Sequence, residues 1–205
     1  MKFGVLGTGM VGSAVAGKLK QLGHDVMVGS RAPDEKTSKA LGLPIGTYAE
    51  AAAHGEWVVN ALPGEPALGY LGQCELDGKI LVDISNYNHA VDQPIETPIG
   101  EAIQRALPKV RVVKALNSVS AHLMVDPGHL GKPHTVFVAG NDAGAKAEVS
   151  DLLRSFGWAD IIDLGDSSAF RAMEQLIPLW MALERVTGGP EFQLQVMRGC
   201  RQASV

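Results

Sequence analysis

A glycine-rich run close to the amino terminus has the residue types and spacing of a phosphate-binding turn. It lies between a short apolar segment and an amphipathic one, and it consists of Gly7, Thr8, Gly9, Met10, Val11 and Gly12. In this spacing the first glycine makes a tight turn, the second lets a pyrophosphate approach the backbone, and the third lets a helix pack closely on a strand. A helix that begins at Met10 would add free backbone N–H groups and the positive end of its dipole. The run therefore predicts a dinucleotide site; the alternative is a glycine-rich turn without a ligand.

The residues after the next apolar segment indicate which dinucleotide is bound. NAD-binding sequences place an acid there for the ribose 2′-hydroxyl, whereas an arginine accommodates a 2′-phosphate. This chain has Ser30 and Arg31 at that point, and Asp25 lies at the start of the segment, about a strand length away. Arg31 can pair with phosphate oxygens through two N–H groups, Ser30 can donate its hydroxyl, and Lys36 could add a further positive charge. We therefore predict NADP(H).

Three further apolar segments end in residues that would share an edge with this site if the sheet is parallel. These ends are Leu62–Pro63, Ser85–Asn86 and Asn117–Ser118, and we expect Leu62, Pro63 and Asn86 on the nicotinamide side. The sequence has no Tyr-x-x-x-Lys, no His–Asp pair at recognisable spacing and no run of metal ligands. His122 is the best placed of six scattered histidines, and we interpret it as structural. We predict no catalytic side chain and no metal, which favours hydride transfer between two cofactor rings.

Composition limits the class of protein and its partners. The chain has 205 residues, of which 46% are hydrophobic and 20% charged, as in an ordinary globular protein. A net charge of −4 gives no basic surface for nucleic acid or an anionic membrane. Cys74 and Cys200 are isolated, which favours a reduced cytoplasmic setting. The apolar run at the amino terminus is too short to cross a bilayer, and we interpret it as strand and helix rather than as a signal peptide.

Apolar periodicity predicts the elements that would position these residues. Nearly continuous apolar runs alternate with amphipathic segments, the pattern of a doubly wound parallel sheet covered on both faces. We expect a Rossmann-type domain over residues 1–120 and a small C-terminal α/β extension over 121–205, packed on the first. The expected strands cover residues 2–6, 26–28, 57–62, 79–84, 111–116, 135–139 and 159–163. The expected helices cover 10–22, 34–41, 48–53, 98–107, 143–156 and 168–186.

The last of these helices is apolar almost all round, which predicts that it is buried. Pro178 should kink it, because a proline removes one backbone N–H. Its apolar side chains exceed what one small sheet can cover, so we predict a homodimer that uses residues 170–183. The alternative is that residues 190–205 fold back over the outer face.

Five segments of the sequence resemble the coenzyme F420-dependent NADP oxidoreductase family. They are GTGMVG at 7–12, VGSR at 28–31, ALP at 61–63, VKALNS at 113–118 and MEQLIPL at 173–179. The resemblance implies that residues 8–11 contact the pyrophosphate and that Ser30, Arg31 and Lys36 contact the 2′-phosphate. It also implies that Leu62, Ala121 and the region of Ile177 face the nicotinamide or its partner ring. The cytosolic modules of membrane ferric reductases are similar in the NADP-binding half.

We therefore expect an NADP(H)-dependent oxidoreductase that transfers hydride between NADPH and an F420-like deazaflavin or a flavin. The alternative is an NADP(H)-binding redox sensor or regulatory module without its own catalysis. An imine or β-hydroxyacid reductase is disfavoured, because those enzymes append a large helical domain and only about forty residues follow the last expected strand.

Overall fold

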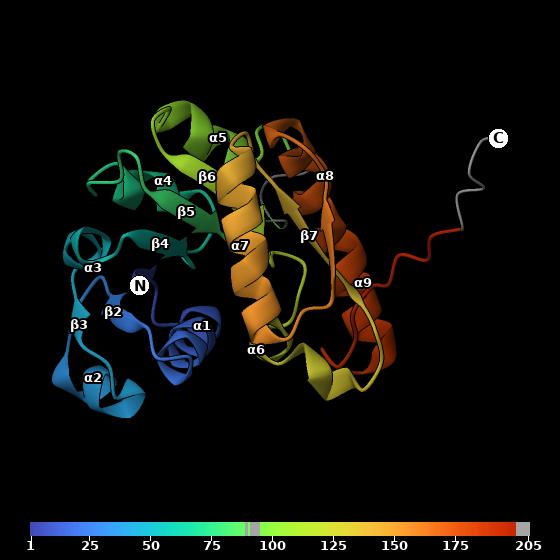
Figure 1. Ribbon diagram of the computed structural model, residues 1–205, viewed down its shortest axis with the longest axis horizontal. Coiled ribbons are helices and arrows are strands. Elements are labelled where there is room, and N and C mark those ends of the chain that lie inside the picture. The colour runs from blue at the N-terminus through green and yellow to red at the C-terminus, as the bar shows by residue number, and fades with distance from the viewer. Residues whose placement is uncertain (89, 91–94, 200–205) are drawn as a thin grey trace.

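The computed structural model describes residues 1–88, 90 and 95–199, so Cys200 and the end of the expected extension lie outside it. Within the described residues, the strands form a single sheet in the order β3-β2-β1-β4-β5-β6-β7-β8 (Figure 1). The expected Rossmann-type α/β fold is thus confirmed. The strands are β1 Lys2–Leu6, β2 Asp25–Gly29, β3 Ile45–Gly46, β4 Trp57–Asn60, β5 Ile80–Asp83, β6 Arg111–Ala115, β7 Thr135–Ala139 and β8 Asp160–Asp163.

One part of the sheet is not parallel, contrary to the expectation. β7 pairs with β6 in the antiparallel sense, with Lys114 opposite Ala139, and β8 then runs parallel to β7. An apolar run predicts a buried strand but not its direction, and an antiparallel strand is common at the side of such a sheet. The strands from β3 to β6 are all parallel, so their carboxyl ends share one edge.

Helices cover both faces of the sheet. They are α1 Met10–Gln21, α2 Glu35–Leu41, α3 Tyr48–His54, α4 Pro66–Leu71, α5 Ile99–Ala106, α6 Ala121–Val125, α7 Ala143–Phe156, α8 Phe170–Glu174 and α9 Leu176–Thr187, with 3₁₀ turns at Pro127–Leu130 and Ser167–Ala169. The chain ends α1 by adopting a left-handed conformation at Gly23, where φ is +83°.

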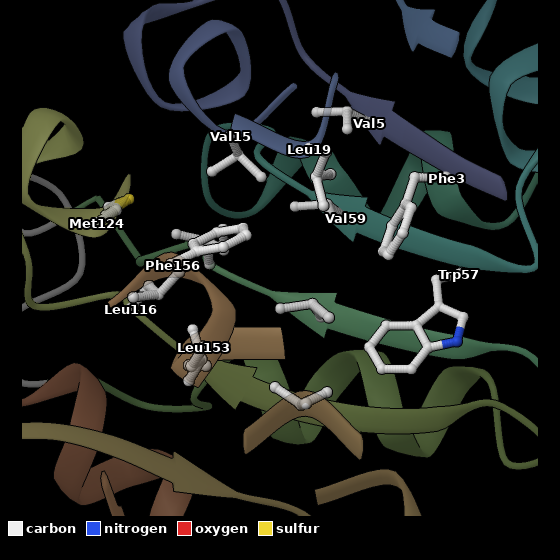
Figure 2. Close-up of a cluster of buried hydrophobic side chains, with 14 of the residues drawn as sticks. Phe3, Val5, Val15, Leu19, Trp57, Val59, Leu116, Met124, Leu153 and Phe156 are labelled. Atoms are coloured by element: carbon white, nitrogen blue, oxygen red, sulfur yellow. The ribbon is translucent and has the colours of Figure 1, made fainter. Parts of the chain in front are cut away.

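Two apolar cores hold the helices against the sheet. On one face Val15 and Leu19 of α1 pack together with Leu153 and Phe156 of α7 over β1 and β4, as Figure 2 shows. On the other face side chains of α3, α4, α5 and α8 form the second core, in which Phe170 is fully buried. The parallel strands are buried on both faces, which explains why they appear in the sequence as continuous apolar runs.

The prediction of one long, buried terminal helix is wrong. The helix is interrupted, and most residues of its second part are exposed or half-buried. The chain forms the 3₁₀ turn, then α8, and begins α9 anew after Gln175. Pro178 therefore lies in the first turn of α9, where its missing N–H needs no partner, and the break precedes it. Of α9 only Ile177 is buried, and Leu179 is 50% exposed.

The segment after α9 returns along the start of β7. The N–H of Thr135 donates to the carbonyl of Leu194 at 2.9 Å, and the N–H of Val196 donates to Thr135 Oγ1 at 2.9 Å. The Phe192 ring lies 5.4 Å from that of Trp180, centre to centre. Residues 190–199 thus cover part of α9. None of the helices among the described residues has the length and apolarity to cross a membrane.

Candidate cofactor site

The glycine turn has the geometry that a pyrophosphate site requires. Gly7 has a φ of +121°, and a Cβ there would lie 2.7 Å from the carbonyl oxygen of Ala61. A Cβ on Gly12 would lie 2.1 Å from the carbonyl oxygen of Gly7, so α1 packs against the turn at backbone distance. At Gly9 nothing lies within 4 Å of an added Cβ. The position at which a ligand would approach is open, while the two structural glycines are fully enclosed.

The start of α1 is also accessible. Thr8 and Gly9 are exposed, Met10 is 85% exposed, and Val11 is half-buried. Gly9 is the residue before the helix, and no side chain caps it, so the first N–H groups of α1 remain available. An exposed methionine beside uncapped N–H groups is what a bound dinucleotide would cover.

Ser30 and Arg31 lie at the carboxyl end of β2, beside the glycine turn. The N–H of Gly7 donates to the carbonyl of Gly29 at 3.0 Å, which places the two loops next to each other. Arg31 and Lys36 are exposed, and Ser30 is half-buried. Sequence reasoning missed Tyr48, the first residue of α3, which lies within 3.1 Å of an added Cβ on Gly29. Burial raises the pKa of Tyr48, Tyr70 raises it further, and the charge of Arg31 offsets part of the increase.

The other predicted residues lie at the same edge but differ in accessibility. Leu62 follows β4, and its side chain is only 3% exposed, whereas Pro63 beside it is exposed. Asn86 follows β5 and is half-buried. Ala121 is half-buried at the start of α6, a helix that packs against α1. All four follow the carboxyl ends of parallel strands, where Pro63 is exposed and Asn86 and Ala121 are half-buried.

Asn117 connects this edge to α8. Asn86 Nδ2 donates to the carbonyl of Asn117 at 2.7 Å, and Asn117 Nδ2 donates to Asn86 Oδ1 at 3.0 Å and to the Met173 carbonyl at 2.9 Å. Asn117 Oδ1 is buried and has no hydrogen-bond partner among the described residues. Leu116 has a φ of +61°, a conformation that costs a non-glycine residue about 1–3 kcal/mol. Backbone strain of this kind clusters at functional sites in proteins, and an unpaired buried acceptor is rare.

A buried ionic network lies directly beneath the strand ends. Lys114 Nζ lies 2.7 Å from Asp83 Oδ2 and 2.8 Å from Glu174 Oε1, and all three side chains are fully buried. Asn60 Nδ2 donates to Asp83 Oδ1 at 2.8 Å, and Ser85 Oγ donates to the same oxygen at 2.6 Å. The network therefore connects the ends of β4, β5 and β6 with α8 and fixes their relative positions.

The protonation of this network follows from burial and from its charges. Burial alone would lower the pKa of Lys114, but Asp83 and Glu174 together outweigh it and raise the pKa. Burial also raises the pKa of Glu174, an effect that Lys114 and the N–H of Gly100 only partly offset. Lys114 is thus a fixed positive charge. The sequence signal was a lysine and an aspartate inside apolar strands, but their pairing with Glu174 is visible only in the fold.

Comparison with known proteins places these features in a family context. A sequence model of the family described as NADP oxidoreductase, coenzyme F420-dependent, matches residues 2–87. A crystal structure from Arthrobacter sp. FB24, described as a candidate F420-dependent NADP reductase, is 42% identical and superposes with a TM-score of 0.89, over 97% of this chain and 100% of that one.

Two curated relatives extend the comparison. The F420-dependent NADP reductase of Methanocaldococcus jannaschii is 29% identical, over 89% of this chain and 92% of its own. The rat metalloreductase STEAP3 is 29% identical over 87% of this chain. This chain spans only 38% of the length of the rat protein.

Proposed function

The chain belongs to the coenzyme F420-dependent NADP oxidoreductase family, and from this premise we propose that it transfers hydride between NADPH and a second ring cofactor. The observation that supports NADPH most directly is the pair Ser30–Arg31, which lies beside the open turn at Gly9 with no acid at the end of β2. NADP(H) is the cofactor of the family. The F420-like deazaflavin or flavin as second substrate, and the roles of individual residues, are our proposal.

The residues present fit this cofactor. The uncapped N–H groups at the start of α1 would bind the pyrophosphate, and Arg31 with Ser30 and Lys36 would bind the 2′-phosphate. Further along the same edge, the exposed Pro63 and the half-buried Asn86 and Ala121 would contact the nicotinamide half of the cofactor. When bound, NADPH supplies the hydride, and the protein supplies position and exclusion of water.

The apolar and amide lining suits transfer between two rings. Pro63 and Ala121 offer surface against which a flat ring can pack. Asn86 is held by two hydrogen bonds, one to the backbone carbonyl of Asn117 and one from the Asn117 side-chain amide. Lys114 lies beneath them, fully buried and paired with two carboxylates, so it positions the strand ends rather than exchanging a proton with substrate. Geometry of this kind promotes transfer by holding the reacting atoms in place.

The cofactor test compares NADPH and NADH binding to the wild-type protein and to Arg31→Ala. Loss of a charge-assisted phosphate contact of about 1.5–3 kcal/mol weakens NADPH binding by roughly one to two decades and leaves NADH unchanged. Arg154→Ala, on the exposed face of α7, is the matched control. Equal affinities of the wild-type protein for the two cofactors would contradict the proposal.

The acceptor test follows NADPH oxidation with F420, FMN, FAD, ferric chelates, and small carbonyls and imines. We expect turnover with F420 or a flavin. Turnover of a carbonyl with a bell-shaped pH profile would contradict ring-to-ring transfer and indicate a general acid. Tight NADPH binding with no turnover would favour the redox-sensor alternative.

We also propose that the protein is a homodimer. The support is the outer side of α9, where Leu179 is 50% and Val186 is 76% exposed despite the return of residues 190–199. A cytoplasmic location likewise stays a prediction from the isolated cysteines.

A further inference from the structure

Three side chains that are distant in the sequence converge at the surface beside α6. His122 belongs to α6, His129 to the 3₁₀ turn Pro127–Leu130, and Glu191 to the segment after α9. His122 Nε2 lies 2.9 Å from Glu191 Oε1, and His129 Nε2 lies 3.2 Å from Glu191 Oε2. One donor atom from each residue lies within 4.8 Å of the others. We propose that these residues bind a divalent transition-metal ion, for which Zn²⁺ is the best-suited candidate.

The three side chains are close enough together to reach one small ion. In a tetrahedral zinc site with bonds of about 2.0–2.1 Å, neighbouring ligand atoms lie roughly 3.3 Å apart. The two His–Glu distances, 2.9 and 3.2 Å, run to different oxygens of the Glu191 carboxylate. One ligand atom from each residue lies within 4.8 Å of the others, so small side-chain adjustments would bring all three onto one ion. The imidazole rings stand at 88° to each other with their centres 5.6 Å apart, so they approach the common point from different directions.

The His122 and Glu191 side chains approach each other at ion-pair distance. His122 Nε2 is buried and has no hydrogen-bond partner within the described part of the chain, although the Glu191 carboxylate lies 2.9 Å away. Two imidazoles and one carboxylate favour zinc over magnesium, which prefers oxygen ligands alone.

The fold fixes the ligands before any ion arrives. The hydroxyl of Ser120, a residue only 6% exposed, donates to the carbonyl of Pro190 at 2.7 Å and so anchors the residue next to Glu191. Trp158 Nε1 donates to the carbonyl of Met124 at 2.9 Å, which holds α6 in place. The three ligand side chains are between 41% and 58% exposed, so an ion can enter from solvent and keep a water as fourth ligand.

Binding at this position would attach the C-terminal segment to the body of the protein. Glu191 comes from that segment, whereas both histidines belong to the region between β6 and β7. The hydrogen bonds of Leu194 and Val196 to Thr135 follow within a few residues. An ion at Glu191 should therefore also protect these backbone groups from exchange.

The test uses the untagged full chain after chelator treatment, dialysed against Zn²⁺ or Mg²⁺ alone. We expect one equivalent of Zn²⁺ and no saturable Mg²⁺ binding. His129→Gln and Glu191→Gln should each weaken Zn²⁺ binding at least about tenfold, since loss even of an outer-shell partner has effects of that size. His54→Gln is the matched control, because His54 pairs with Asp25 at 3.2 Å and belongs to no cluster of three among the described residues.

Hydrogen exchange provides an independent measurement. Zn²⁺ should slow exchange across residues 190–199 in the wild-type protein and in His54→Gln, but not in His129→Gln. Absence of saturable Zn²⁺ binding, or equal binding by the wild-type protein and both ligand variants, would overturn the site. Unchanged exchange in the zinc-loaded wild-type protein would overturn the attachment of the segment. Neither measurement requires NADPH, so failure here is distinct from failure of the proposed hydride transfer.

Discussion

Glu174 Oε1 and Lys114 Nζ lie 2.8 Å apart in the interior, where both side chains are fully buried. The same carboxylate accepts hydrogen bonds from the N–H groups of Ile99 and Gly100 at 2.8 and 2.9 Å. Glu174 thus caps the start of α5 and neutralises a lysine of β6 at once. The carboxyl edge of the parallel strands is therefore held by ionic contacts and not by apolar packing alone.

Removal of Lys114 should strongly destabilise the protein. Lys114→Met leaves Asp83 and Glu174 buried without their counter-charge, and breaking a buried pair in this way costs about 3–5 kcal/mol. Urea denaturation measures the loss. Lys39→Met is the control, because its partner Glu35 is 88% exposed, and that change should stay within about 1 kcal/mol. A comparably small loss for Lys114→Met would contradict the assigned role.

Two glycines of α1 should respond to alanine in opposite directions. Gly12→Ala places a Cβ 2.1 Å from the carbonyl oxygen of Gly7, so it should destabilise the fold by about 1–3 kcal/mol and weaken NADPH binding. Gly17→Ala meets nothing within 4 Å and should stabilise α1 by up to about 1 kcal/mol. Thermal unfolding of the two variants checks the contrast, which equal shifts would refute.

Gly9→Ala should separate binding from stability. An added Cβ at Gly9 meets nothing within 4 Å, so the melting temperature should stay close to that of the wild-type protein. The methyl group would nevertheless occupy the space through which a pyrophosphate approaches the backbone, and NADPH affinity should fall. Calorimetric titration gives the affinity, and unchanged binding would place the pyrophosphate elsewhere.

The capping box of α3 should make stability depend on pH. Glu50 Oε2 accepts a hydrogen bond from the N–H of Thr47 at 2.7 Å, and this bond, followed by that from the Thr47 hydroxyl, lowers the pKa of Glu50 below 4.5. A lowered folded-state pKa means that the stabilisation is present above pH 4.5 and is lost as pH falls through the folded value. Urea unfolding of wild type and Glu50→Gln should therefore differ more at pH 7 than at pH 3. Glu35→Gln is the control, and a pH-independent difference for Glu50→Gln would contradict this origin.

The proposed homodimer predicts a light-scattering mass twice that of one chain at micromolar concentration. Leu179→Asp should dissociate it, because Leu179 is 50% exposed on the outer side of α9, whereas Trp180 is covered by Phe192 of the same chain. Circular dichroism must show unchanged helix content for the result to count. A wild-type protein of single-chain mass would exclude the dimer.

The sequence predicted most of the fold because apolar periodicity reports burial directly. β1, β7 and α7 lie where their patterns placed them. β3 has only two residues, and α4 begins at a proline and contains a glycine, so neither leaves a periodic signal. The direction of β7 depends on how the chain enters the sheet, which local pattern does not encode.

The candidate site likewise contains some residues that the sequence predicts and others that only the fold brings together. Gly7, Gly9 and Gly12 could be interpreted from spacing alone, because each is required by local backbone geometry. The meeting of Lys114 with Glu174, and of His122 with Glu191, depends on contacts between distant parts of the chain. The strained backbone of Leu116 leaves no trace in residue type, since leucine is not a residue that favours a left-handed conformation.

The position of Glu174 has a consequence for modular reuse of this nucleotide-binding unit. If a gene segment ended after β6, Lys114 would keep only Asp83 as counter-ion, and the first amides of α5 would lose their acceptor. A larger protein that incorporates this nucleotide-binding unit is therefore expected to contain the chain through α8. Recombination boundaries should fall beyond residue 174, although β6, the last strand of the all-parallel part of the sheet, ends at Ala115.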